Sequence, residues 1–257
     1  LAVPTEVHAE IARPLLESGV HVLVEKPVSR TLEEADRMIE AARRGAAALM
    51  VGHLERYNPA LVALRPHVRA PLYFEIHRVG QVTARSLDID VVLDVMIHDL
   101  DIVQWLVGAE AEVTDVRGVG IPVLTNRVDA ANARIEFSTG AVANITASRV
   151  GTEKIRKMRF FQPHDYVAVD YVTRFASVSS LAAPSATGSW PGVQIRHLDV
   201  VDTEPLRAEI EDFLAAAEAR RPAPITGEDG RRALALAHRL LERIHEHAAL
   251  AGVNTRG

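Results

Sequence analysis

One short stretch, His21-Val22-Leu23-Val24-Glu25-Lys26-Pro27, most limits the folds that this chain can adopt. The apolar run over 20–24 favours a strand, and its continuity is typical of a parallel strand buried on both faces. Pro27 cannot donate to a sheet, and it biases Lys26 toward an extended conformation. Glu25 and Lys26 are therefore expected at the carboxyl end of a buried strand, where open α/β sheets bind ligands. The Lys26 ammonium can contact a substrate oxygen there, or the two charges can form a strand-end salt bridge; the spacing alone favours neither.

Composition excludes several classes of protein. The chain has 257 residues, enough for one large domain or two ordinary ones, and 48% hydrophobic and 25% charged residues are typical of a soluble globular protein. A net charge of -5 argues against a general nucleic-acid or membrane-surface binder. Without cysteine, the chain has no disulfide framework, thiolate nucleophile or cysteine metal site. No apolar run approaches the roughly 18 residues of a membrane span and no signal peptide is visible, so we expect a cytoplasmic protein.

The first residues of the chain resemble the end of a strand and not the start of a domain. Leu1 is not a methionine, and residues 1–5 resemble the end of a core strand that enters a loop. We therefore interpret the sequence as a fragment that has lost the part preceding this strand.

Residues 1–55 alternate between helix and strand patterns. A helix is expected over 6–18, with Pro14 as a possible kink, and the strand over 20–24 follows. Thr31-Leu32-Glu33-Glu34 has the spacing of a capping box, which predicts a helix that ends near Gly45. A second short apolar strand is expected over 47–51. This order is that of the second half of a doubly wound parallel sheet.

Strand patterns dominate from residue 71 onward. Ser138-Thr139-Gly140 predicts a hairpin between strands at 129–137 and 142–148. Further strands are expected at 72–79, 114–123, 155–162, 166–171 and 198–201. The region 177–192 is rich in Ser, Ala, Pro and Gly and is expected to be a loop. Helices are expected over 60–69, 205–220 and 227–251.

A further helix, expected over 91–107, carries three polar residues on one face. Asp94, His98 and Asp101 stand at i, i+4 and i+7 among apolar neighbours. His98 can act as a general base with Asp94 orienting it, or the three can form a solvated face with a weak Asp–His pair of about 0.3–0.5 kcal/mol. No further carboxylate cluster supports a metal site, so no metal is expected.

Three motifs together resemble the Gfo/Idh/MocA family of NAD(P)-dependent sugar and cyclitol oxidoreductases. They are Val3-Pro4-Thr5-x-x-His8, Glu25-Lys26-Pro27 and Asp94-x-x-x-His98-x-x-Asp101, in the family's order. The long strand-rich half and the closing helix after Thr226-Gly227-Glu228-Asp229-Gly230 match the family as well. The resemblance extends over essentially the whole chain, and several motifs in the correct order are far more specific than any one of them.

The resemblance implies a fold class and two domains. It implies an α/β chain in which 1–55 is the remainder of a dinucleotide-binding Rossmann domain. Residues 56–257 would form an α+β substrate and oligomerisation domain with a large, mostly antiparallel sheet. The family's glycine-rich phosphate-binding turn would lie before Pro4, and Gly118-x-Gly120 cannot replace it because Ile121-Pro122 follows instead of a helix. The fragment alone is therefore expected to bind dinucleotide poorly and to be inactive.

The resemblance also implies roles for individual residues. Lys26 would hydrogen-bond the reacting hydroxyl, His98 would remove its proton as hydride leaves, and Asp94 would be the carboxylate beside that base. A cation and a base that act on a developing alkoxide each lower the barrier to hydride transfer. The residues implied for cofactor binding are Pro4, Thr5, His8, Glu25 and Lys26. NAD and NADP stay open as cofactors, since the deciding residue would lie upstream.

The segment Gly52-His53-Leu54-Glu55-Arg56-Tyr57-Asn58-Pro59-Ala60 points to a substrate. It is similar to the signature of a subgroup linked to UDP-N-acetylglucosamine 3-dehydrogenases, with Tyr57 in place of the more usual Phe. An arginine past a strand end suits a phosphate or carboxylate, although Arg56 can instead pair with Glu55 or cap the next helix. The substrate-binding residues implied are Arg56, Tyr57, Asn58 and Asp101.

Other functions stay open at this point. The enzyme can instead oxidise a free sugar or a cyclitol such as myo-inositol. A non-catalytic sugar or nucleotide sensor with the same fold has no need of Lys26, Asp94 and His98 together, and a purely structural module is a third reading. The expected partners are a small sugar and a second copy of the chain, because a large open antiparallel sheet usually has one face to cover.

Overall fold

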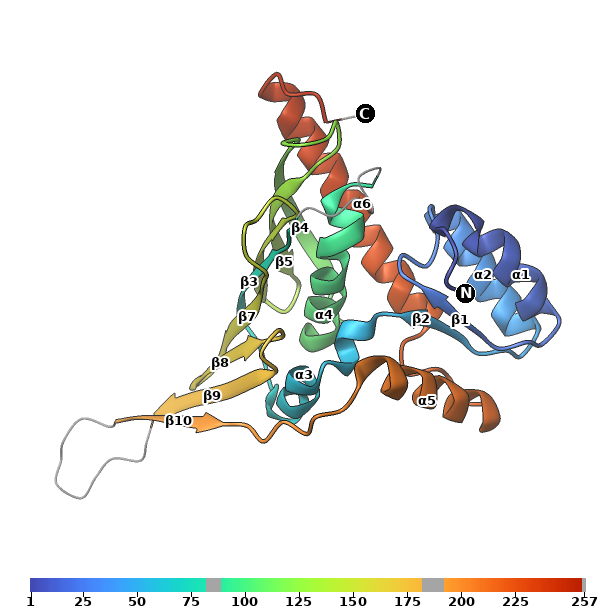
Figure 1. The fold of residues 1–257 in the computed structure, drawn as a ribbon, viewed down its shortest axis with the longest axis horizontal. Coiled ribbons are helices and arrows are strands. Elements are labelled where there is room, and N and C mark those ends of the chain that lie inside the picture. Colours follow the sequence, from blue (N-terminus) through green and yellow to red (C-terminus); the bar gives the residue numbers. More distant parts are fainter. Residues whose placement is uncertain (82–88, 182–191, 256–257) are drawn as a thin grey trace. The chain divides into compact units, whose positions relative to one another are not determined.

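The computed structural model describes residues 1–81, 89–181 and 192–255, which form two compact units (Figure 1). Unit 1 consists of Leu1–Tyr57 and Thr203–Arg239. Unit 2 consists of Asn58–Asp202 and Leu240–Gly257. No helix within the described residues is long and apolar enough to cross a membrane.

Unit 1 contains the expected alternation of helices and strands. β1 (Val22–Glu25) pairs in parallel with β2 (Leu49–Gly52), with Val22 opposite Leu49. A 3₁₀ turn leads into α1 (His8–Glu17), and α2 (Leu32–Arg44) separates the strands. The Thr31 side chain caps α2 by accepting a hydrogen bond from the Glu34 N–H at 3.2 Å. The predicted capping box is confirmed.

A third segment lies along β1. The N–H of Val22 bonds to Ala48 O at 2.9 Å, whereas that of Glu25 bonds to Leu1 O at 3.0 Å. Because N–H groups three residues apart in a strand point to opposite edges, Leu1 lies on the edge of β1 away from β2. The first residue therefore contributes to the sheet edge beside Glu25.

The last two helices also contribute to unit 1. α5 (Pro205–Glu218) and the first half of α6 (Gly227–Leu250) group with residues 1–57, although the sequence analysis assigned them to the second domain. A β-bridge joins Thr226 to Met50. A Cβ added at Gly230 would lie 2.7 Å from the Val51 side chain, so glycine lets α6 pack closely on β2. These contacts between distant segments explain the difference.

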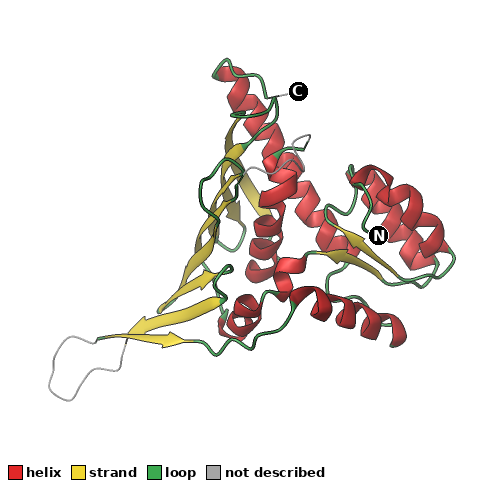
Figure 2. Ribbon diagram, viewed as in Figure 1, coloured by secondary structure: helices red, strands yellow, loops and turns green. Residues whose placement is uncertain are grey.

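Unit 2 is built on an eight-stranded sheet in the order β10-β9-β8-β7-β3-β6-β5-β4 (Figures 1 and 2). All neighbours are antiparallel except β3 and β6, so the expected large, mostly antiparallel sheet is confirmed. The strands are β3 (Tyr73–Val79), β4 (Val113–Ile121), β5 (Ala130–Phe137), β6 (Val142–Ser148), β7 (Ile155–Gln162), β8 (Asp165–Asp170), β9 (Phe175–Leu181) and β10 (Val193–His197).

The two faces of this sheet differ in character. Phe74, Ile76 and Phe160 on one face are buried. The second half of α6 covers part of that face, since a Cβ at Gly118 would lie 2.5 Å from Leu240. The opposite face carries Tyr73, which stacks on Phe161 with ring centroids 5.8 Å apart.

Two sequence expectations for the strands of unit 2 need correction. Residues 177–181 belong to β9 instead of a loop, because Ala176 and Val178 are buried and the strand pairs along its length with β8. The rest of that expected loop, 182–191, lies outside the described residues. The last strand is 193–197 and not 198–201. All five residues of β10 are exposed on an edge, so its pairing has no hydrophobic signal.

The helix expected over 60–69 is shorter than predicted. α3 (Pro59–Leu64) is followed by a 3₁₀ turn at Arg65–His67. Pro66 has no N–H to continue the α-helical hydrogen bonds, which explains the early end.

Candidate functional site

The carboxyl end of β1 carries two of the predicted site residues. Glu25 is exposed and Lys26 is half-buried directly after the strand. The Lys26 N–H donates to the Glu25 carboxylate at 3.3 Å, and the Lys26–Pro27 peptide bond is cis. Both side chains therefore stand at the sheet edge where α/β proteins bind ligands.

His8 holds this strand end in place from α1. The ring is fully buried, with Nδ1 at 3.1 Å from Pro27 O and Nε2 at 3.0 Å from Val3 O. Pro4 and Thr5 lie between these contacts, at the 3₁₀ turn before α1. His8 thus ties the Pro4–Thr5 turn to the Lys26–Pro27 turn within unit 1.

The buried Arg56 has an ionic partner. Its side chain is only 6% exposed, and Nη1 lies 3.7 Å from the Asp229 carboxylate. Asp229 caps α6, because it accepts from the Thr226 N–H at 3.0 Å and donates its own N–H to Thr226 Oγ1 at 3.1 Å. Burial alone would raise the pKa of Asp229, but Arg56 and the Thr226 hydrogen bonds outweigh it and hold that pKa below its usual value. Arg56 therefore supports a helix start.

Tyr57 and Asn58 also make contacts within their own units. The Tyr57 hydroxyl donates to Asp212 at 3.1 Å, and burial and the Asp212 charge raise the pKa of the phenol. Asn58 caps α3 by accepting from the Ala60 N–H at 3.1 Å, and its amide donates to Tyr171 O at 3.2 Å. Both residues help to fix the segment that leaves β2.

The helix of unit 2 that carries Asp94 and His98 begins with a π-helical turn. This turn spans Val92–Met96, and α4 (Ile97–Val107) continues it. Such turns are frequent at functional sites. Asp94 and His98 are partly exposed, whereas Asp101 is 2% exposed and lies in the core. Asp94 lines a small polar cavity of about 150 Å³ together with Arg78, Arg149 and Arg156.

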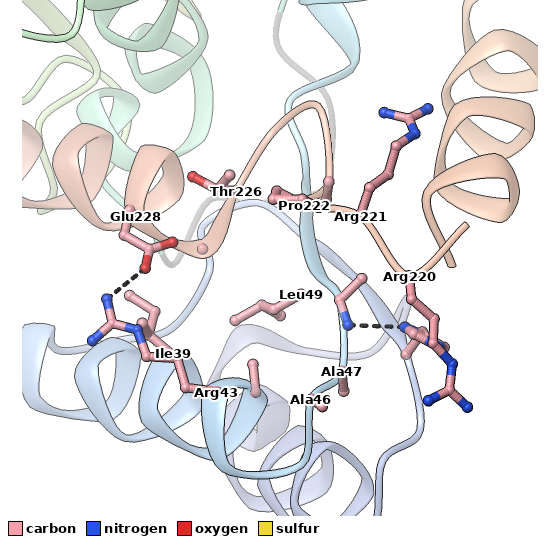
Figure 3. A pocket seen from close by; sticks show the side chains of 15 residues that line it. Ile39, Arg43, Ala46, Ala47, Leu49, Arg220, Arg221, Pro222, Thr226 and Glu228 are labelled. Atoms are coloured by element: carbon pink, nitrogen blue, oxygen red, sulfur yellow. Dashed lines mark hydrogen bonds and ion pairs between the residues drawn. The ribbon is translucent and has the colours of Figure 1, made fainter. Parts of the chain in front are cut away.

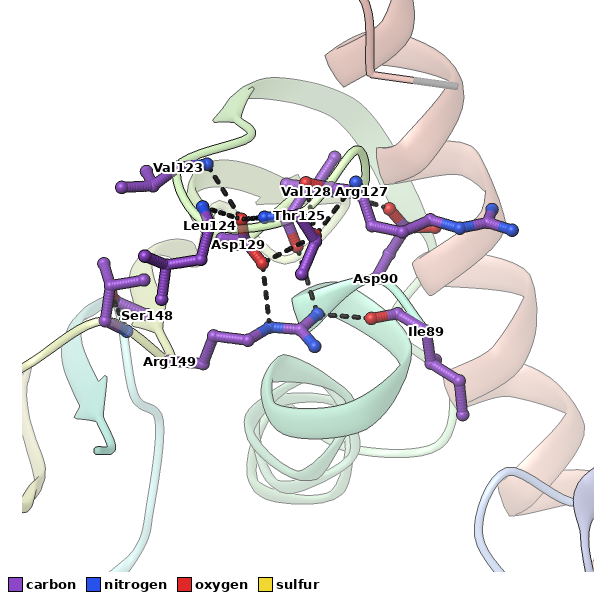
Figure 4. Close-up of polar contacts among 11 residues, drawn as sticks. Ile89, Asp90, Val123, Leu124, Thr125, Arg127, Val128, Asp129, Ser148 and Arg149 are labelled. Carbon is purple, nitrogen blue, oxygen red and sulfur yellow. Dashed lines mark hydrogen bonds and ion pairs between the residues drawn. The ribbon is translucent and has the colours of Figure 1, made fainter. Parts of the chain in front are cut away.

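A network of hydrogen bonds anchors the start of this helix (Figure 4). The buried Asp129 carboxylate accepts from the backbone N–H groups of Val123, Leu124 and Thr125 at 2.8, 2.7 and 2.8 Å. Arg149 lies 3.4 Å from the same carboxylate and donates to Val128 O at 3.2 Å and to Ile89 O. Val128 in turn accepts from the Val91 N–H at 2.8 Å. Arg149 thus connects the cavity beside Asp94 to the first residues of its helix.

The charged residues that hold this region together were not predicted from the sequence. Arg78, Asp99, Asp129 and Arg149 are all buried. Arg78 and Arg149 occur singly in or just after β-strands, and nothing in the spacing of these four residues marks them as partners. Asp99 follows His98 directly, which was the one available signal.

A cavity in unit 1 lies away from all of these residues (Figure 3). Its volume is about 370 Å³, and it lies beside the residues that enter β2, at the opposite end of the strands from Lys26. Arg43 and Glu228 form an ion pair of 2.9 Å on its rim, and His21 Nδ1 accepts from the Ala48 N–H at 2.9 Å. None of the predicted site residues lines it. This cavity is therefore separate from the predicted site residues.

Gly118 and Gly120 have a packing role. Both lie within β4, and a Cβ at Gly120 would approach Ile244 and Val128 to 2.7 Å. These glycines leave room for side chains of unit 2, in agreement with the expectation that they do not form a phosphate-binding turn.

Comparisons with known proteins agree in family. Residues 1–53 match the model "Oxidoreductase family, NAD-binding Rossmann fold", and 32–161 match the "GFO/IDH/MocA C-terminal domain". UDP-N-acetylglucosamine 3-dehydrogenase of Acidithiobacillus ferrooxidans is 41% identical over 92% of this chain and 75% of that protein. A solved structure of that enzyme from the same organism has a TM-score of 0.89 at 40% identity, covering 95% of this chain and 78% of the other.

More distant relatives share parts of the chain or the fold. scyllo-Inositol 2-dehydrogenase (NAD(+)) of Bacillus subtilis is 30% identical over 58% of this chain and 47% of that protein. Levoglucosan dehydrogenase in complex with NADH and levoglucosan has a TM-score of 0.81 at 20% identity, covering 96% of this chain and 78% of that one, a likeness of fold.

Proposed function

The chain belongs to the Gfo/Idh/MocA family of oxidoreductases, and we propose that it transfers a hydride between the 3-position of a UDP-N-acetyl sugar and a nicotinamide dinucleotide. The main support is its 41% identity, over nearly its whole length, to UDP-N-acetylglucosamine 3-dehydrogenase. The position of Lys26 at the carboxyl end of a parallel strand adds a physical reason.

Residues of unit 1 fit the cofactor role that the family implies. The exposed Glu25 and the turn fixed by the buried His8 present a preformed edge, which supports contacts from Pro4, Thr5, Glu25 and Lys26 to the nicotinamide end of NAD or NADP, with His8 holding the turn in place. When bound, this dinucleotide supplies the acceptor or donor of the hydride. The chain's own residues must then hold the sugar hydroxyl and move its proton.

Lys26 and His98 are proposed to act on that hydroxyl. The Lys26 ammonium donates a hydrogen bond to the oxygen and stabilises the negative charge that develops as the C–H bond breaks. His98 takes the hydroxyl proton in the oxidation direction and returns it in the reduction direction. Asp94 is proposed to stabilise the charged form of His98. Asp101 is proposed to support the helix, because its carboxylate is buried.

The cavity beside Asp94 is proposed to take part of the sugar. Its lining combines the carboxylate of Asp94 with the N–H donors of Arg78, Arg149 and Arg156. Donors and acceptors around one small space suit a group with several hydroxyls. Asp99 and Asp129 balance the charges of Arg78 and Arg149, which favours a polyhydroxyl group over a bare anion. Contacts of the sugar with Arg56, Tyr57 and Asn58 stay predictions.

A free cyclitol is the second candidate substrate. The identity to scyllo-inositol 2-dehydrogenase covers only part of the chain, but that relative is also named as a dehydrogenase of a hydroxylated ring. The small volume of the cavity beside Asp94 suits a single ring and is compatible with either substrate.

The second copy of the chain is proposed to bind through the open face of the unit 2 sheet. Phe161 on β7 is 40% exposed, and it contacts both Tyr73 and Tyr166. Ile121 and Ile195, on other strands, are exposed as well. Exposed apolar and aromatic residues along a sheet face are typical of an interface between subunits.

The test uses the full-length gene product with UDP-N-acetylglucosamine, myo-inositol and glucose, and follows the absorbance of the reduced nicotinamide. We expect turnover of the nucleotide sugar and a loss of about 100- to 1,000-fold in kcat for Lys26→Met and for His98→Ala. Lys154→Met is the matched control, because Lys154 is exposed just before β7. Turnover of a free polyol alone would contradict the proposed substrate. Binding of dinucleotide without any turnover would favour a sensor.

A further inference from the structure

The cavity at the amino ends of β1 and β2 has no part in the proposed function. Its volume is about 370 Å³, and all of its lining residues belong to unit 1. His21 directly precedes β1 and Ala48 directly precedes β2, whereas Lys26 follows the carboxyl end of β1. Small-molecule sites in proteins are typically hollows of about 300–1,000 Å³. The cavity is therefore large enough for a ligand that does not overlap the site proposed for the sugar.

The middle of this cavity is apolar. Ile39, Leu49, Pro222 and Ala223 all line it. Ile39 comes from α2, Leu49 from the first position of β2, and the other two from the segment between α5 and α6. Apolar side chains around a hollow favour a ligand with an apolar body, because that body leaves water when it binds. A bare inorganic ion would make no use of this surface.

The charges in the lining are unbalanced. Three arginines line the cavity, and Glu228 is the one carboxylate among its described lining residues. Glu228 is already paired with Arg43 at 2.9 Å. In Figure 3 this ion pair lies on one side of Leu49, and Arg220 and Arg221 lie on the other side. The excess positive charge is therefore on the side of Arg220 and Arg221.

The end of α5 fixes the backbone of these two arginines. The Arg221 N–H donates to Ala216 O at 3.0 Å and the Arg220 N–H donates to Ala217 O at 3.2 Å, which is the pattern of a Schellman turn. Arg220 has a φ of 48°, in the left-handed region that glycine adopts most easily. The turn itself would favour glycine at this position. An arginine here is therefore better explained by what its side chain does.

His21 adds a neutral hydrogen-bond donor to the same lining. Its Nδ1 atom accepts from the Ala48 N–H at 2.9 Å. Because Nδ1 accepts, the neutral ring carries its proton on Nε2, which is left as a donor. Together with the two guanidinium groups, the lining supplies donors suited to an anion.

We propose that this cavity binds a small organic phosphate, with the phosphate against Arg220 and Arg221 and an apolar ring over Leu49. Guanidinium groups bind phosphate oxygens through paired N–H donors, and two of them match the double negative charge of a phosphate monoester better than the single charge of a carboxylate. The site does not depend on the proposed function, because it lies at the opposite end of the strands from Lys26.

The test measures binding of phenyl phosphate to the full-length protein by titration calorimetry. Replacing both arginines, in the double variant Arg220→Gln and Arg221→Gln, should weaken binding about 10- to 100-fold, because charge-assisted hydrogen bonds are lost. Both side chains are exposed, so the variant should fold as the parent does. Arg117→Gln is the matched control, because Arg117 is an exposed arginine of unit 2, paired with Asp115, and should bind as the parent does.

Phenol and inorganic phosphate test the two halves of the ligand separately. Each should bind more weakly than phenyl phosphate. Inorganic phosphate that binds as tightly as phenyl phosphate overturns the role of the apolar lining, and phenol that does so overturns the role of the arginines.

Three further results would overturn the site itself. They are equal affinity of the parent and the double variant, displacement of phenyl phosphate by UDP-N-acetylglucosamine, and no binding of phenyl phosphate up to about 10 mM. Thermal unfolding gives an independent readout, since a ligand that binds only the folded state raises the unfolding midpoint. Phenyl phosphate should raise the midpoint of the parent and of Arg117→Gln, and it should raise that of the double variant less.

Discussion

Arg78 donates two buried hydrogen bonds to Asp99, from Nε to Oδ2 at 2.7 Å and from Nη2 to Oδ1 at 2.8 Å. The two side chains are 3% and 0% exposed. Asp99 follows His98 in the chain, and Arg78 belongs to β3 in the middle of the sheet. This fork–fork pair therefore fixes the orientation of the helix on which the proposed base lies.

Breaking this pair should strongly destabilise unit 2. Asp99→Asn leaves the buried guanidinium of Arg78 without its opposite charge, and losing one partner of a buried pair costs about 3–5 kcal/mol. Denaturation in urea measures the change. Glu75→Gln is the control, because Glu75 pairs with the half-exposed Arg159 at 2.7 Å and surface pairs contribute at most about 1 kcal/mol. If Asp99→Asn and Glu75→Gln lost equal amounts of stability, the argument that a buried ion pair matters more than a surface pair would be contradicted.

Asp129 should make the stability of the protein depend on acid pH. Burial would raise its pKa, but the N–H groups of Thr125, Val123 and Leu124 outweigh burial and hold it below the usual value. A lowered folded-state pKa gives stability that is present above the unfolded-state value and is lost as pH falls through the folded-state value. Asp129→Asn should thus be less stable than the parent at neutral pH, and the difference should shrink below about pH 4. Asp115→Asn, at an exposed pair with Arg117, should show no such convergence.

Replacing Ala46 with glycine should increase the stability of the folded protein. Its φ of 50° lies in the left-handed region, at the position just past α2 where helices usually have glycine. Glycine removes the steric strain of the left-handed conformation in the folded state, and it also increases the conformational entropy of the unfolded chain. Because the first effect is the larger in free energy, Ala46→Gly should stabilise the protein by about 0.5–1 kcal/mol. Ala47→Gly is the matched control and should destabilise. Thermal unfolding of both variants decides, and a loss of stability at Ala46 would contradict the argument.

Gly230→Ala should disturb the packing of α6 on β2. The added methyl group would lie 2.7 Å from Val51, and overpacking of this kind typically costs about 1–3 kcal/mol. Gly192→Ala is the control, since no atom of the described residues lies within 4 Å of its Cβ position. Chemical denaturation measures the change in stability. If Gly230→Ala proves as stable as the parent, the Val51 side chain can move aside without a loss of stability.

Local signals in the sequence were sufficient for most of the fold. The capping box at Thr31 and the hairpin at Ser138-Thr139-Gly140 need only a few adjacent residues, and both are confirmed. β10 is different, because it is an exposed edge strand that forms through backbone hydrogen bonds to β9, and none of its five residues is buried. Pro66 shortened α3, although the apolar pattern continued beyond it.

The sequence by itself determined the family, the parallel β1–β2 pair and the position of Lys26 at its carboxyl end, since these follow from short motifs and the alternation of helix and strand. Only the tertiary structure decided that α5 returns to unit 1, that Arg56 meets Asp229, and that Glu209 is buried. Charged residues far apart in the chain meet only after folding. Their partners and their pKa values depend on burial and distance, and neither quantity can be predicted from the spacing of residues along the chain.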